Sequence, residues 1–121
     1  MKNLKAIKTE IYITTNFTGF HCWPAAPEEV SFLRDLHRHV FHVKVAVRVT
    51  HDDRDVEFFK LKKDADAVIK LLAVELETAC RQMSCEMMAG FIARSLMSGY
   101  NVSSVEVSED GENGARLEFA I

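Results

Sequence analysis

The chain has 121 residues, of which 48% are hydrophobic and 27% are charged. This size and composition predict one globular domain and exclude a disordered chain. The formal net charge is −3 and no apolar run has the length of a membrane span, so neither a nucleic-acid nor a membrane partner is expected. The three cysteines show no C-x-x-C spacing, and residues 1–16 lack a signal-peptide pattern. We therefore expect a cytoplasmic protein with free thiols.

Two segments in the first third of the chain alternate apolar and polar side chains, which is typical of half-buried β-strands. The first covers residues 4–17, and its apolar positions are Ile7, Ile11, Ile13 and Phe17. The second covers residues 39–50 and alternates more strongly. Residues 21–35 between them contain both prolines and are predicted to form a loop with at most a short turn of helix. Residues 52–55 are predicted to form a turn.

Two helices are predicted after residue 56, because the apolar period changes from two to about 3.6. The stripe of the first helix consists of Leu61, Ala65, Val68, Leu72, Leu76, Ala79 and Met83. Ser84 is a suitable N-cap for the second helix, which is expected to end near Gly99. Its stripe consists of Met88, Phe91, Ile92 and Leu96. Two more strands follow, around residues 105–107 and 115–119, with a hairpin loop at residues 110–114.

The predicted element order is therefore ββααββ. It indicates an α+β domain over residues 1–121, in which a four-stranded antiparallel sheet carries two helices on one face. Such a sheet has two open edges, and open edges usually pair with another copy or are blunted. We expect the chain to form a homo-oligomer.

Three histidines are predicted to lie on one face of the first two strands. His37 and His39 are two residues apart, so both imidazoles point to the same side. His21 is in phase with the first strand and joins them if the two strands pair as a hairpin. Three neutral imidazoles with an open position are typical of a catalytic zinc site, although ordinary core or surface histidines remain the alternative. His42 has the opposite parity and His51 lies in the turn, so both are predicted to be non-ligands.

Glu109 continues the alternation of Val105 and Val107, which predicts a carboxylate at the rim of the buried face. A carboxylate in that position requires N–H donors, because burying it unpaired is costly. The edge of a guanidine-like ring would supply two such donors. The alternative is that the strand ends at Val107 and leaves Glu109 in solvent.

The three cysteines are interpreted separately. Cys22 follows His21 on the strand and is expected to point to the opposite face as an inert thiol. Cys80 is expected in the core of the first helix. Cys85 stands in the first turn of the second helix, where the helix dipole could favour a thiolate. The acidic residues 106–112 are expected to form a solvated hairpin.

Five short motifs, in this order along the chain, resemble those of the 6-pyruvoyltetrahydropterin and 6-carboxytetrahydropterin synthase family. They are F-T-G-F-H at residues 17–21 (F-x-A-x-H in the family), L-H-R-H-V-F at 36–41 (L-H-G-H-x-Y), V-E-F-F-K-L-K at 56–62 (V-D-F-x-D-L-K), S-C-E followed by an alanine at 84–89 (T-[TA]-E-N-x-A) and V-E-V-S-E at 105–109 (V-x-V-x-E). The stretch from the first motif to the last, residues 17–109, makes up most of the chain.

The resemblance implies a T-fold subunit that binds Zn²⁺ through His21, His37 and His39 and a pterin through Glu109. It implies that Ser84 and Cys85 hold the ring from a neighbouring subunit, and that the subunits form a homo-trimer or a homo-hexamer. In that family the metal binds and acidifies the hydroxylated side chain of the pterin. A cysteine and an Asp–His pair move protons while triphosphate leaves.

Two departures bear on the activity. The family's cysteine, four residues before H-x-H, is replaced by Leu33, and its L-D-H segment is Leu-Glu-Thr at residues 76–78. Loss of general acid–base groups typically lowers rates by about 10²–10⁴-fold. We therefore expect a zinc-dependent lyase acting on a pterin or purine-like compound, with Glu28, Glu29 or Asp35 as a replacement base. The alternatives are a non-catalytic T-fold protein that sequesters or senses such a ligand, and a purely structural domain.

Overall fold

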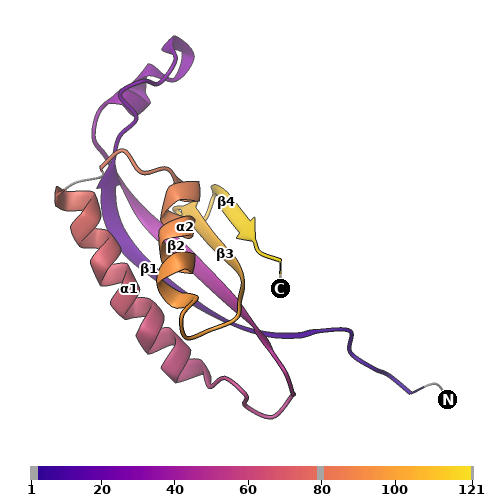
Figure 1. Ribbon diagram of the computed structural model, residues 1–121. Helices are drawn as coiled ribbons and strands as arrows, with labels where there is room; N and C mark the ends of the chain where they lie inside the picture. Colours follow the sequence, from indigo (N-terminus) through magenta and orange to yellow (C-terminus); the bar gives the residue numbers. More distant parts are fainter. Residues whose placement is uncertain (1–2, 79–80, 121) are drawn as a thin grey trace.

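The computed structural model describes residues 3–78 and 81–120. In chain order its elements are β1 (Thr9–His21), the 3-10 helix η1 (Glu28–Arg34), β2 (His37–Val49), α1 (Phe58–Thr78), α2 (Cys85–Leu96), β3 (Val102–Glu109) and β4 (Asn113–Glu118). The strands form one antiparallel sheet in the order β1-β2-β3-β4. Both helices cover the same face of the sheet, and η1 projects beyond its end (Figure 1). The predicted ββααββ fold is confirmed.

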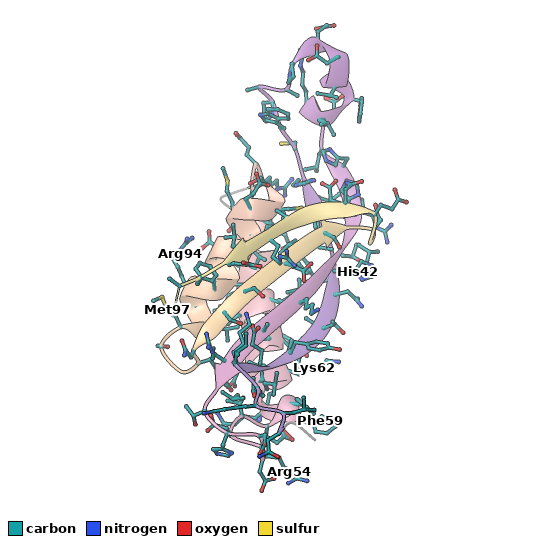
Figure 2. All side chains as sticks on the ribbon, turned by 90° about the vertical axis from the view of Figure 1, so that its right-hand side faces the viewer. His42, Arg54, Phe59, Lys62, Arg94 and Met97 are labelled. Atoms are coloured by element: carbon teal, nitrogen blue, oxygen red, sulfur yellow. The ribbon has the colours of Figure 1, made fainter. Side chains whose placement is uncertain are left out.

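Alternation along the strands decides which side chains enter the core. Phe41, Val43, Val45 and Val47 of β2 are fully buried on the helix-covered face. Figure 2 views the molecule from its β4 side, with Arg94 of α2 and Met97, the residue after α2, on the outer helical side and His42 on the opposite, open side of the sheet. The predicted phase of β2 is therefore confirmed.

A bulge in β3 adds one more buried position to the sheet. The β2–β3 register shifts between Ala46 and Val47, which pair with Ser104 and Val102. Ser103 is the extra residue, and its hydroxyl donates to the carbonyl oxygen of Ala46 at 3.1 Å. The shift allows Val102 as well as Val105 to face the core, which simple alternation does not predict.

The helices bury the apolar stripes expected of them. In α1 the buried residues include Leu61, Ala65, Val68, Leu72 and Leu76, and in α2 they include Met88, Ile92 and Leu96. The predicted N-cap is confirmed, because the Ser84 hydroxyl accepts a hydrogen bond from the Met87 N–H at 3.1 Å. Within the described residues, no helix has both the length and the apolar character required to cross a membrane.

Two predicted boundaries are corrected. β1 begins at Thr9 rather than at residue 4, and Leu4 and Ile7 are 100% and 96% exposed. The reason is that Thr9 pairs with Val49, the last residue of β2, so no partner strand remains for residues 4–8. β1 ends at His21, the residue that was predicted to lie in phase at the end of the first strand. The apolar stripe of the first helix was predicted to reach Met83, but α1 ends at Thr78 and Met83 lies between the two helices. The predictions for Ala79 and Cys80 fall outside the described residues.

The β3–β4 hairpin yields a stability prediction. A Cβ atom on Gly114 would lie 2.2 Å from the carbonyl oxygen of Val107 and 2.5 Å from Ser108 Cα, and both are backbone atoms that cannot move aside alone. Gly114→Ala should therefore lower the free energy of unfolding by about 1–3 kcal/mol, the usual cost of overpacking. Thermal unfolding followed by circular dichroism measures this, with Gly99→Ala as the control because a Cβ atom there would meet no other atom within 4 Å. Equal melting temperatures for the two variants would contradict the prediction.

Candidate metal centre and adjoining cavity

The β1–β2 hairpin brings the three predicted histidines together at one end of the helix-covered face. His21 pairs directly with His37, and His39 follows two residues along β2. The ring centroids of His21 and His37 are 4.5 Å apart, those of His37 and His39 5.1 Å, and those of His21 and His39 5.5 Å. All three imidazoles are therefore within reach of one ion.

Two of these imidazoles are oriented by backbone carbonyl groups. The Nδ1 atom of His21 lies 2.9 Å from the carbonyl oxygen of Met83, and that of His37 lies 2.8 Å from the carbonyl oxygen of Asp35. A carbonyl oxygen only accepts hydrogen bonds, so each Nδ1 carries the proton. The Nε2 atom of each neutral ring is then left with a lone pair for a cation, as in most histidines that bind metals.

The third imidazole is oriented by Asp110, which the sequence pattern assigned to a solvated loop. The Asp110 carboxylate accepts hydrogen bonds from His39 Nδ1 at 2.6 Å and from the Val40 N–H at 2.9 Å, and these bonds hold the pKa of Asp110 below its ordinary value. The Asp110 backbone has φ 55°, a left-handed conformation that aspartate tolerates. No local pattern reveals this contact, since it depends on the β2–β3 register.

The Nε2 atom of His21 is buried and has no hydrogen-bond partner. The nearest carboxylate oxygen, Glu109 Oε2, lies 2.9 Å away, and it lies 3.7 Å from His39 Nε2. When His21 is neutral and donates through Nδ1, its Nε2 lone pair faces a lone pair of the carboxylate, and a proton or a metal ion shared by the two atoms relieves the repulsion. One ligand atom each from His21, His37, His39 and Glu109 lie within 4.8 Å of one another. This set of nitrogen and oxygen donors fits a divalent ion such as Zn²⁺.

Glu109 occupies the rim position that the alternation predicts. β3 continues through Glu109, which pairs with Phe41, so the alternative that the strand ends at Val107 is wrong. The Glu109 side chain is only 24% exposed. Its second oxygen, Oε1, lies 3.4 Å from the Asn113 amide nitrogen, which is at most a weak hydrogen bond.

A cavity of about 490 Å³ opens beside the cluster, and His21, His37 and Glu109 form part of its wall. Other parts of the wall are apolar or contain sulfur and include Trp23, Leu33, Met83, Met87 and Cys85. Ser84 also lines it, at the N-terminus of α2. Ser84 and Cys85 thus line the same cavity as His21 and His37 within one chain.

One expectation about a thiol is corrected, and the state of a second thiol is decided. Cys22 lines the cavity instead of pointing away from it, because β1 ends at His21 and strand alternation does not extend to the next residue. Burial, with smaller contributions from Glu109 and Glu86, raises the pKa of Cys85 to about 12. The helix dipole, which could have favoured a thiolate at Cys85, is therefore outweighed by desolvation.

The other proposed polar groups lie elsewhere. His42 faces the open side of the sheet (Figure 2), and His51 lies in the turn after β2, 3.6 Å from Asp55. Glu28 forms an ion pair with Arg34 at 3.1 Å on the projecting η1, and the neighbouring Glu29 is exposed. Asp35 contributes its backbone carbonyl group to His37.

No family model and no curated protein matches the chain. Its structure is similar to that of 6-pyruvoyl tetrahydropterin synthase from Caenorhabditis elegans, with a TM-score of 0.64 and 13% identity over 98% of this chain and 100% of that one. It is also similar to an uncharacterized protein from Wolinella succinogenes, with a TM-score of 0.66 and 17% identity over 93% of this chain and 99% of that one. At these identities the similarity concerns the fold. Over nearly its whole length, the chain has the T-fold of the pterin synthase structure, as the sequence motifs predicted.

Proposed function

We propose that this protein is a zinc-dependent, pterin-synthase-like protein that acts on a pterin or purine-like compound. The observation that carries the proposal is the buried Nε2 atom of His21, which meets a Glu109 oxygen at 2.9 Å and has no hydrogen-bond partner. A metal ion held by His21, His37 and His39 removes this conflict. The fold similarity to a pterin synthase supports the same assignment independently.

The residues around the cavity have separate roles in this proposal. Zn²⁺, when bound, supplies a Lewis acid that acidifies a hydroxyl group of the ligand. Glu109 accepts N–H bonds from the ring edge, and the N-terminal turn of α2 at Ser84 and Cys85 contacts the ring. The apolar walls formed by Trp23 and neighbouring side chains exclude water from the ring faces.

We also propose that the protein works in the cytoplasm as a homo-trimer or homo-hexamer. β1 and β4 are the two edge strands of the sheet. Assembly of subunits into a closed ring would remove these edges. Phe32, on the projecting η1, is 71% exposed and would gain burial in such an assembly.

A non-catalytic role is the second candidate, and two observations favour it. The cavity wall has Leu33 where the resembling family has its cysteine, and the Cys85 thiol is protonated at neutral pH. A protein of this kind would bind the ring without turnover.

Turnover separates the two candidates. The zinc-loaded protein is incubated with a dihydropterin that carries a triphosphate side chain, and released triphosphate is measured. We expect release above that of the His37→Ala/His39→Ala variant. Ring binding without any release would contradict catalysis and favour the non-catalytic protein.

Zinc binding should depend on the histidine cluster. His37→Ala/His39→Ala should lose stoichiometric zinc, because one remaining neutral imidazole cannot retain the ion. Native mass spectrometry should show three or six wild-type chains with one zinc ion each, and His42→Ala, the control on the open face, should match the wild type. Full zinc occupancy in the double variant would contradict the ligand assignment, and a monomeric wild type would contradict the assembly.

Ring binding should depend on Glu109. Glutamine in its place would present an N–H group to one of two ring N–H donors, so Glu109→Gln should weaken binding by about 2–3 kcal/mol, the scale of hydrogen bonds to a charged group. The measurement is calorimetric titration with pterins and guanine-like compounds, at zinc concentrations that saturate both proteins. Glu112→Gln is the matched control, since it removes the same charge from an exposed position of the same hairpin. Equal affinities for wild type and Glu109→Gln would refute the anchoring role.

A further inference from the structure

The position of Glu109 indicates a second role for this residue. We infer that its carboxylate is the fourth ligand of the metal in the ring-free protein, which makes the centre a three-histidine, one-carboxylate site. The inference rests on the proposed metal site at His21, His37 and His39, and it adds a ligand that neither the motifs nor the strand alternation assigns to the metal.

The contacts of the two carboxylate oxygens carry the inference. Oε2 points at the imidazoles, 2.9 Å from His21 Nε2 and 3.7 Å from His39 Nε2. Oε1 makes only the 3.4 Å contact with the Asn113 amide nitrogen. An oxygen this close to the two Nε2 atoms is placed to bind the same ion as they do. With neutral imidazoles, an ion held by these atoms would replace the repulsion between lone pairs with coordination.

The backbone holds the carboxylate at this place. Glu109 pairs with Phe41 across the β2–β3 ladder, and the Phe41 ring packs edge-on against His21 at 5.1 Å and His39 at 5.8 Å between centroids. The same pairing that buries Phe41 thus brings Glu109 to the imidazole cluster. His21 is only 7% exposed, so water has little access to the inner side of the site. A protein ligand there can complete the four-coordinate shell that Zn²⁺ prefers.

The neighbouring carboxylates of Asp110 and Glu112 are not placed to bind the metal. Both oxygens of Asp110 already accept hydrogen bonds, one from His39 Nδ1 and one from the Val40 N–H. Glu112 is exposed in the hairpin turn. Among the described residues, Glu109 is the one carboxylate with an oxygen within 4.8 Å of a nitrogen of each of the three imidazoles.

A bidentate pair of ring N–H bonds uses both oxygens of the carboxylate, and coordination through Oε2 would engage one of those oxygens with the metal. Ring binding would therefore compete with the metal for the lone pairs of Glu109. By linkage, metal affinity and ring affinity are coupled through this one side chain.

The test is the zinc affinity of the ring-free protein, measured by competition with a chelator. Glu109→Gln should raise the zinc Kd by about 10–100-fold, the range seen when a supporting group of a metal site is removed. Glu112→Gln, which removes the same charge from the same hairpin, should remain within twofold of wild type. Glu109→Asp keeps the charge but shortens the side chain, so it should also weaken zinc binding. Far-UV circular dichroism confirms that each variant is folded.

Cobalt substitution gives a second readout that does not depend on activity. The visible absorption of Co²⁺ reports its ligand set, so the Co²⁺ spectrum of Glu109→Gln should differ from wild type while that of Glu112→Gln should not. If the wild type binds neither ion, the proposed metal site fails and this inference fails with it. If the wild type binds zinc and Glu109→Gln matches it in affinity and in Co²⁺ spectrum, the metal site stands and only the role of Glu109 as a ligand is overturned.

Discussion

The register between β1 and β2 is the constraint on which the candidate site depends. It places His21 opposite His37 and puts His39 on the same face, two residues farther along β2. A slip of one residue would turn one strand's side chains to the other face and separate the imidazoles. The same slip would expose fully buried core residues such as Phe41 and Val43, each worth about 1.5–3 kcal/mol in burial. Burial of the core therefore enforces the geometry of the site.

The orientation of the imidazoles comes from a different source. Their hydrogen-bond acceptors belong to three separate segments: the connection between the helices at Met83, the residue after η1 at Asp35, and the β3–β4 turn at Asp110. Two of the three acceptors are backbone carbonyl groups, which any residue at those positions would supply. Only Asp110 contributes through its side chain. The site is thus held by the path of the chain more than by a recognisable pattern of polar residues.

This division explains how much the sequence could predict. Strand alternation is a local property, and it correctly predicted the shared face of the three histidines and the rim position of Glu109. The helical stripes and the Ser84 cap were predicted for the same reason. The start of β1 at Thr9 depends on where its partner strand ends, which alternation does not reveal.

The errors near the cavity arise from distant contacts or from the end of an element. Asp110 reaches His39 across 71 residues of sequence. Cys22 enters the cavity because β1 stops one residue earlier, and the Cys85 pKa is raised chiefly by burial under the rest of the fold. Composition and periodicity carry no information about these contacts.

The chain distance between the parts of the centre has a consequence for the order in which they assemble. His21 and His37 are 16 positions apart and meet within one hairpin. Asp110 joins His39 only after 71 residues are looped out, and closing that longer loop costs about 1.3 kcal/mol more in chain entropy. Local contacts form sooner than distant ones in small domains. During synthesis, the nitrogen ligands therefore emerge and can pair while both helices and the carboxylates of the last hairpin are still to be made, so the imidazole cluster precedes the groups that orient and close it.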